Sequence, residues 1–343
     1  MSTTGNDIRK NTSVTIGLSR GAYGARFYDS FFTNEFAKLE TARCERYASI
    51  YSIILIHIGD FDNGDREPTK RELDDFMKTM VAEITDVVRN CDVAGLIEER
   101  KILVVLPRTD YLGSLITIKK LTRALEPVTV KGHPYASLIF TQATYPQDAK
   151  GYTELLNVAM KRIEISKDSL WERDKLKTRL FWEVVAHFTG GTLNGFDHTT
   201  FELGANEKLG HEFLEKINKV IVEDVGRNAG SRGILYIAPP SIKTDMPILN
   251  TIATVGKTAT KIFVVGTKKD PELEMRNATG ITITDPRMSG FYFTFFINAQ
   301  AAYAIICKEV WGDIYTCFHT SNPYIVEGLI TKFQRDSMLQ EQL

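Results

Sequence analysis

Two short apolar runs with four charged residues between them constrain the fold of this chain most strongly. The runs are CDVAGLI and ILVVL, and the charged stretch is EERK, residues 98–101. Short apolar runs rich in β-branched residues are typical of buried strands, and a charged interruption between two of them is typical of an exposed turn. We therefore predict strands at 91–97 and 101–106, joined as a β-hairpin with the charged stretch at its tip.

The segments around this hairpin alternate between helical and strand patterns. Apolar residues such as Phe31, Phe36 and Leu39 recur at helical spacing before it, and Leu73, Phe76, Met80, Ile84 and Val87 share one side of a second helix. Helices are predicted at 27–47, 68–89, 112–125 and 152–167, and strands at 52–59 and 135–145. This order is typical of an α+β domain in which helices cover an antiparallel sheet. We expect a loose lead-in at residues 1–19 and this domain at 20–168.

The second half of the chain follows a different pattern. The helical pattern continues through residues 170–188 and predicts one connecting helix over 152–188, with an aromatic end at Phe181 and Trp182. The glycine-rich TGGTLNG marks a boundary, so 169–195 is predicted as connecting helix and linker. Beyond it, helices are predicted at 207–225, 247–256 and 322–340, and strands at 233–240, 261–267, 280–285 and 291–309. This alternation favours an α/β domain at 196–343.

Charge and composition exclude several classes of function. The net charge of −1 provides no general attraction to DNA, RNA or an anionic membrane. The apolar stretches are short and the N-terminus is polar, so no membrane insertion and no signal peptide are expected, and a cytoplasmic protein is predicted. The cysteines lack metal-binding spacing and are predicted to be reduced, buried thiols: Cys44, Cys91, Cys307 and Cys317. Neither a metal site nor a cofactor is expected.

Five segments of the first half occur in an order that matches a known family. They are RGAYGARFY (20–28), IILIHIGDF (53–61), CDVAGLIEERKILVVLP, ATYPQDA (143–149) and ELLNVAMKRIEISK (154–167). Together they resemble the motifs of GGDEF domains, the diguanylate cyclases that make cyclic di-GMP from two GTP molecules. The resemblance covers residues 20–168 and implies a GGDEF-like sheet with flanking helices in a bacterial signalling protein.

The residues at the family's signature position do not keep its chemistry. Glu98 and Glu99 replace two glycines that let the backbone approach the GTP phosphates, and each adds a negative charge there. Arg100, Lys101 and His57 stand where the family has carboxylates for Mg²⁺, and these side chains cannot form a hard magnesium site. The sequence therefore predicts a degenerate domain without cyclase activity. We interpret EERK as a solvated tip or, alternatively, a contact site for a phosphate or an acidic partner.

Two further side chains near these motifs receive structural interpretations. His57 lies in an apolar strand and is interpreted as a half-buried histidine with satisfied hydrogen bonds. Lys167 resembles a family lysine that contacts a phosphate in active enzymes. Because the metal site is absent, Lys167 is predicted to be a surface lysine.

The segment Arg89-Asn90-Cys91-Asp92 resembles the inhibitory RxxD site at which active family members bind cyclic di-GMP. An arginine can donate to O6 and N7 of guanine, and an aspartate can accept from its N1–H and amino group. Arg89 and Asp92 are therefore a candidate ligand-binding pair. The alternative is structural: Arg89 ends helix 68–89 and complements its dipole, and Asp92 caps the following turn.

Two hypotheses of different kinds follow. In one, the chain is a non-catalytic receptor that binds cyclic di-GMP at Arg89 and Asp92, and the ligand changes its contacts with protein partners. In the other, it is a nucleotide-independent interaction or dimerisation scaffold, for which a homodimer is one expected form. The second half resembles small bacterial sensory domains of the DICT type, and its ligand is not predicted.

Overall fold

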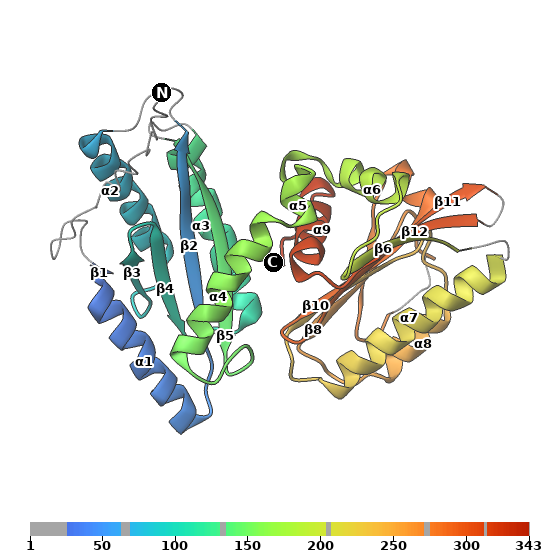
Figure 1. The fold of residues 1–343 in the computed structure, drawn as a ribbon. Coiled ribbons are helices and arrows are strands. Elements are labelled where there is room, and N and C mark those ends of the chain that lie inside the picture. The colour runs from blue at the N-terminus through green and yellow to red at the C-terminus, as the bar shows by residue number, and fades with distance from the viewer. Residues whose placement is uncertain are drawn as a thin grey trace, which may run out of the picture.

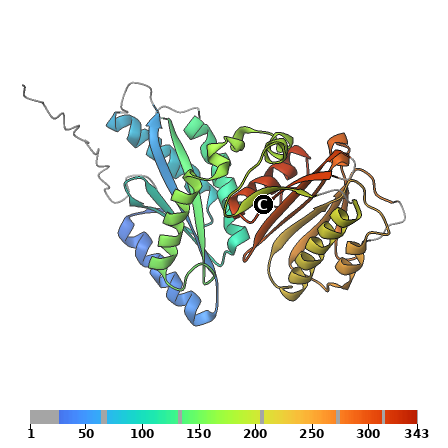
Figure 2. The ribbon, with the colours of Figure 1, turned by 45° about the vertical axis from the view of Figure 1, so that its right-hand side comes forward.

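Two sheets, each with helices on both faces, lie side by side in this computed structural model (Figure 1, Figure 2). The structure describes residues 26–62, 69–130, 135–203, 207–270, 275–311 and 314–342. The predicted lead-in at residues 1–19 lies outside the described residues. The predicted fold class, an α+β half followed by an α/β half, is confirmed.

The first half contains every helix and strand predicted for it. Its elements are β1 (Phe27–Tyr28), α1 (Ser30–Tyr47), β2 (Tyr51–Asp62), α2 (Lys70–Val87), β3 (Val93–Glu98), β4 (Lys101–Pro107), α3 (Tyr111–Val130), β5 (Tyr135–Tyr145) and α4 (Tyr152–Lys167). The short β1 was not predicted. The sheet has the order β1-β3-β4-β2-β5, in which all neighbours are antiparallel except β1 and β3.

Helices cover both faces of this sheet, which explains why its strands have continuous apolar sequences. Ile54 and Ile56 of β2 pack against α2 and α3 on one face. Ile53 and Leu55 pack against α1 and α4 on the other. Because successive side chains of a strand point to opposite faces, an uninterrupted apolar run supplies two cores at once.

Local sequence signals set the start of α2 and the packing of α1. Thr69 and Glu72 form a capping box, in which Glu72 N donates to Thr69 Oγ1 and Thr69 N donates to the Glu72 carboxylate. On β3, a Cβ atom at Gly95 would lie 2.1 Å from Thr33 Oγ1 and 2.5 Å from the Tyr28 carbonyl oxygen. Glycine at this position therefore lets α1 and β1 approach the hairpin closely.

The apolar residues that predicted α1 do not form its buried face. Phe31 and Leu39 are 76% and 64% exposed. The residues that face the sheet are Thr33, Ala37, Glu40 and Cys44. Apart from Glu40 these are small side chains, which lets the helix lie close to β3, whereas Phe31 and Leu39 lie on the outer face.

The second half is built on a larger sheet. Its elements are β6 (His198–Leu203), α7 (Glu207–Arg227), β7 (Gly233–Ala238), α8 (Pro247–Thr254), β8 (Thr260–Gly266), β9 (Thr279–Thr282), η2 (Pro286–Gly290), β10 (Phe291–Asn298), β11 (Ala302–Trp311), β12 (Ile314–Thr320) and α9 (Pro323–Asp336). The order is β6-β12-β11-β10-β7-β8-β9, with parallel pairing only among β7, β8 and β9. The single run predicted as strand, 291–309, is two antiparallel strands. Strands β6 and β12 were not predicted.

The prediction of one connecting helix over 152–188 was wrong. The helix ends at Lys167 and is followed by α5 (Leu170–Arg173), η1 (Leu176–Thr178) and α6 (Phe181–Gly190). These short pieces turn back onto the second sheet and pack with α9 in its core. Trp171 contacts α9 closely at Gly328, where a Cβ atom would lie 2.5 Å from the indole ring.

The two halves contact each other through α3. Tyr111, Leu112 and Leu115 of α3 belong to the same buried cluster as Trp171 and the core of the second half. Arg232 Nη1 lies 3.0 Å from Asp110 Oδ1, and Arg123 also pairs with Glu341 across this boundary. The arrangement therefore combines apolar packing with ion pairs between residues far apart in sequence.

Two findings bear on the composition-based expectations. Among the described residues, no helix has both the length and the apolar character needed to cross a bilayer. Cys44, Cys307 and Cys317 are buried free thiols, as predicted, but Cys91 is exposed. Cys91 is exposed because it lies in the turn between α2 and β3 and not within the strand predicted at 91–97.

Candidate functional site

The charged stretch forms the tip of the predicted hairpin. Glu98 and Lys101 face each other at the ends of β3 and β4, and Lys101 Nζ lies 2.6 Å from Glu98 Oε2. Glu99 and Arg100 make the turn between them and are exposed. Lys101 is therefore partly neutralised by its own hairpin, and the glutamates remain at the solvent-facing end.

His57 lies on β2 beside this tip, directly opposite Lys101 of β4. Burial lowers the pKa of its imidazole, and the positive charges of Lys167, Lys101 and Arg100 lower it further. The Nδ1 atom is buried and has no hydrogen-bond partner among the residues that the structure describes. The predicted half-burial is correct, but the expectation of satisfied hydrogen bonds was wrong for Nδ1.

Lys167 at the end of α4 completes a cationic environment around His57. Its Nζ lies 3.1 Å from Glu164 Oε1, and the side chain is 40% exposed, as expected of a surface lysine. Within the described part of the chain, no group of three or more His, Cys, Asp or Glu side chains could hold a metal ion. The chemistry available at this end of the sheet is that of a neutral imidazole among cations, which does not suit Mg²⁺.

Arg89 and Asp92 are brought together by the turn that follows α2. Arg89 Nε and Nη2 donate to Asp92 Oδ2 and Oδ1, at 3.1 and 2.9 Å, and the Arg89 backbone N–H donates to Oδ2 at 2.8 Å. Arg89 Nη2 also donates to Thr109 Oγ1 at 2.7 Å and to the Pro107 carbonyl oxygen. These bonds raise the pKa of the Arg89 guanidinium, with Asp92 as the main cause.

The two members of this pair differ in accessibility. The Asp92 side chain is 2% exposed, whereas that of Arg89 is 54% exposed. Helix α2 ends at Val87, so the alternative prediction that Arg89 closes the helix is wrong, while the prediction that Asp92 caps the turn is confirmed. Asp92 therefore orients Arg89, and only the arginine presents a polar edge to solvent.

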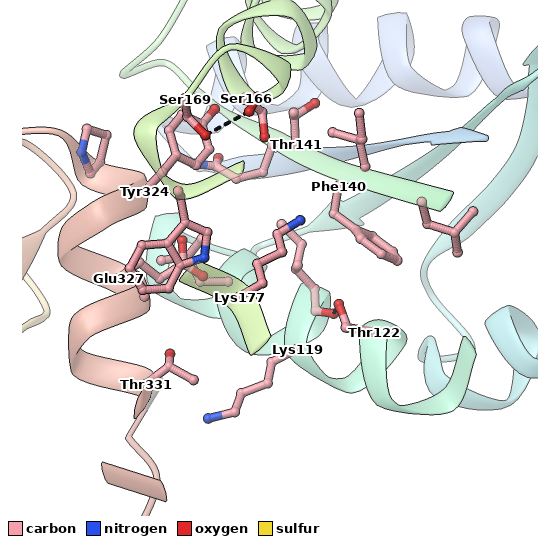
Figure 3. Close-up of a pocket in the computed structure, with 18 of the residues that line it drawn as sticks. Lys119, Thr122, Phe140, Thr141, Ser166, Ser169, Lys177, Tyr324, Glu327 and Thr331 are labelled. Carbon is pink, nitrogen blue, oxygen red and sulfur yellow. Dashed lines mark hydrogen bonds between the residues drawn. The ribbon is translucent and has the colours of Figure 1, made fainter. Parts of the chain in front are cut away.

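Sequence reasoning missed a cavity of about 770 Å³ at the boundary between the halves. It is lined by parts of α3, β5, α4, the segment 169–177 and α9 (Figure 3). Its lining residues come from five separate stretches of the chain, and no motif links them. Only the contact between the two halves creates this cavity.

The solved structures similar to this chain include GGDEF domains from two bacteria. The GGDEF domain of YfiN from Pseudomonas aeruginosa is 18% identical, with 40% of this chain and 89% of that chain covered and a TM-score of 0.36. The FimX GGDEF domain from the same organism is 8% identical, with 42% and 89% covered and a TM-score of 0.38. The GGDEF domain of DgcB from Caulobacter crescentus, solved with c-di-GMP, is 11% identical, with 48% and 93% covered and a TM-score of 0.35.

These structures belong to the family that residues 20–168 resemble in sequence. No protein-family model and no curated protein matches the chain. The resemblance of the second half to DICT-type sensory domains remains a prediction.

Proposed function

We propose that the first half is a non-catalytic signalling domain that binds cyclic di-GMP at Arg89. The observation that carries the proposal is the exposed Arg89 guanidinium, which Asp92 fixes in place. A fixed guanidinium loses little conformational entropy when it binds a planar acceptor such as guanine. The proposal therefore concerns recognition of a nucleotide and not its synthesis.

The proposed loss of catalysis is supported by charge at the hairpin. A triphosphate at the tip would meet Glu98 and Glu99, and one like-charge contact at about 4 Å costs roughly 4 kcal/mol at an effective dielectric near 20. The magnesium ions that would offset this repulsion need carboxylate ligands, and His57 is held neutral by burial and by nearby cations. Both requirements of the cyclase reaction therefore fail at the same place.

The structure modifies the role that the sequence suggested for Asp92. Its carboxylate already accepts from Arg89 and is buried, so it could accept from guanine N1–H only by releasing the arginine. Arg89 Nη1 makes no hydrogen bond to any described residue and is the donor that remains for guanine O6 or N7. We therefore assign recognition to Arg89 and orientation to Asp92.

Calorimetric titration of cyclic di-GMP into the purified protein tests this assignment. Wild-type protein should bind at micromolar concentration, and Arg89→Ala should abolish the heat. Arg71→Ala is a matched control, because Arg71 is an exposed arginine at the start of α2 whose carboxylate partner, Asp75, lies 4.0 Å away. Absence of heat with wild-type protein, or equal loss in both variants, would reject the receptor proposal.

Incubation with GTP and Mg²⁺ tests the loss of catalysis separately. We expect no cyclic or linear dinucleotide. Product formation that disappears when His57 or Lys101 is changed to alanine would show that these residues support the reaction, and the non-catalytic assignment would be wrong.

A second candidate function is a dimerising scaffold, and the outer face of α1 favours it. We define this face as Tyr28, Phe31, Phe32 and Leu39, of which the rings of Tyr28 and Phe32 stack with their centroids 4.4 Å apart. Contiguous exposed apolar side chains of this kind mark interaction surfaces. The partner that we propose is a second copy of this chain, because in a two-fold contact the same apolar patch serves both copies and each covers the other.

Sedimentation of the purified protein over a range of concentrations tests the scaffold. The wild-type chain should form a dimer that Phe31→Ser with Leu39→Ser disrupts. Val220→Ser is the control, because Val220 is 60% exposed on α7, outside the proposed face. A wild-type protein that stays monomeric, or a dimer that persists in the double variant, would remove this candidate.

A further inference from the structure

The cavity between the halves has the size of a small-molecule site. Its volume of about 770 Å³ lies within the range typical of ligand pockets. One wall is formed by α3 and β5 of the first half, and the opposite wall by α9 of the second half (Figure 3). A molecule bound in this cavity would contact both halves.

The cations around the cavity are already engaged. Each has a carboxylate or carbonyl partner: Lys119 and Arg123 pair with Glu341, Arg162 with Asp148, Lys177 with Glu172, Arg335 with Asp336, and Lys332 donates to the carbonyl oxygens of Lys177 and Arg179. An anionic ligand would therefore have to displace an acid that is already bound to its cation. The basic side chains of the lining are therefore offset by partners that the protein itself supplies.

Glu327 on α9 is different. It makes no hydrogen bond or ion pair with any described residue, and it is partly buried where it borders the cavity. Burial raises the pKa of its carboxyl group to about 7, and the positive charge of Lys119 opposes this rise only in part. Acids removed from water are normally hydrogen-bonded or ion-paired, and Glu327 has no such partner among the described residues. A ligand in the cavity could be that partner.

Aromatic side chains of the cavity provide a surface for the apolar part of an organic cation. The aromatic rings of Tyr111, Phe140, Trp171 and Tyr324 all line the cavity. The hydroxyl groups of Tyr111 and Tyr324 make no hydrogen bond to a described residue, and so they can accept from an N–H donor. Aromatic faces attract ammonium groups, and this attraction strengthens when water is excluded.

We propose that this cavity binds a small organic cation, a protonated amine with an apolar or aromatic group, whose ammonium pairs with Glu327. The ammonium group provides the positive partner that Glu327 does not have among the described residues. The apolar group packs against the aromatic side chains of the cavity. Because the walls belong to different halves, the bound amine would stabilise their observed arrangement. This site is independent of the nucleotide site proposed at Arg89, and each can fail without the other.

Phenethylamine and its neutral analogue 2-phenylethanol form a matched pair of probes. Calorimetry at about pH 8 should show that phenethylamine binds the full-length protein at least tenfold more tightly than the alcohol. Glu327→Gln should weaken amine binding by at least tenfold and leave alcohol binding unchanged. Glu212→Gln is the control, because Glu212 is an exposed acid on α7 that does not line the cavity, and it should bind the amine as the wild type does.

The pH dependence provides a readout that a purely structural role of Glu327 would not produce. With a pKa of about 7, the carboxylate fraction rises roughly tenfold between pH 6 and pH 8, so amine affinity should rise by about the same factor. The charged group that acts on Glu327 is Lys119 of α3, which is itself paired with Glu341. Affinity in the Glu327→Gln variant should not change with pH.

Three results would overturn the proposal. The first is no binding of phenethylamine to wild-type protein at about 10 mM. The second is equal affinity for the amine and the alcohol, which would show a cavity that selects shape and not charge. The third is unchanged amine affinity in Glu327→Gln, which would place the bound amine elsewhere.

Discussion

Replacing Glu327 with glutamine should stabilise the protein, and the gain should depend on pH. The carboxyl group has a pKa of about 7 when folded and 4.5 as its ordinary value, and burial is the main cause. Between these values the folded protein binds more protons than the unfolded chain, so stability falls as pH rises from 4.5 to 7 and stays low above it. Glutamine has nearly the same shape and no charge, and it should avoid this loss.

The magnitude follows from the size of the shift. A difference of 2.5 pKa units corresponds to about 3 kcal/mol at roughly 1.4 kcal/mol per unit, and water in the cavity that solvates the carboxylate would reduce it. For a folding unit of roughly 150–250 residues, a gain of about 3 kcal/mol corresponds to a rise in Tm of about 5 °C or more. We expect that rise near pH 8 and almost no difference near pH 4.5.

Thermal unfolding of the wild type, Glu327→Gln and the exposed control Glu212→Gln, followed by circular dichroism across this pH range, measures the effect. The control should follow the wild type at every pH. A glutamine variant that is less stable than wild type near pH 8 would refute the reasoning, because it would show that the carboxylate has a stabilising partner. A difference independent of pH would refute it as well.

The remaining predictions concern other parts of the chain. Arg89→Ala should abolish the rise in Tm that cyclic di-GMP causes in wild-type protein, and a rise that survives in the variant would place the ligand elsewhere. Burial holds the folded pKa of His57 below 6.5, so the unfolded chain binds more protons as pH falls below that value. Wild-type protein should therefore lose stability there, whereas His57→Leu should lose less when both are denatured with urea at about pH 5 and pH 8. Gly328→Ala should cost roughly 1–3 kcal/mol in urea denaturation, because its Cβ would meet the Trp171 ring, whereas Gly290→Ala meets no atom within 4 Å and should cost less.

Much of the first half was predictable because its signals are local. The runs SIILIHIG and ILVVL are buried on both faces, and continuous apolar sequence is what such strands require. The hairpin at EERK followed from charge between two apolar runs, and the pairing of Glu98 with Lys101 agrees with it. The order of elements on either side of the hairpin was correct for the same reason.

Predictions that depended on which face is buried were less accurate. Phe31 and Leu39 have helical spacing but lie outside, because mostly small residues form the inner face of α1 and let the helix approach β3 closely. The connecting helix was predicted too long, because the helical pattern of residues 170–188 does not reveal that the chain divides into α5, η1 and α6, which pack with α9. In both places the partner of the segment, and not the segment itself, decided the outcome.

The sequence by itself determined the strands and the charged hairpin tip at residues 98–101, because these depend on residue type and near neighbours. Tertiary structure alone decided that Asp92 holds Arg89 and that Glu327 borders a cavity between the halves without a hydrogen-bond or ion-pair partner among the described residues. Whether a charge is paired depends on which distant atoms surround it, and the free energy of an enclosed carboxyl group depends on those surroundings. The sequence therefore determines which ionisable groups are present, and the fold determines whether each is paired and charged.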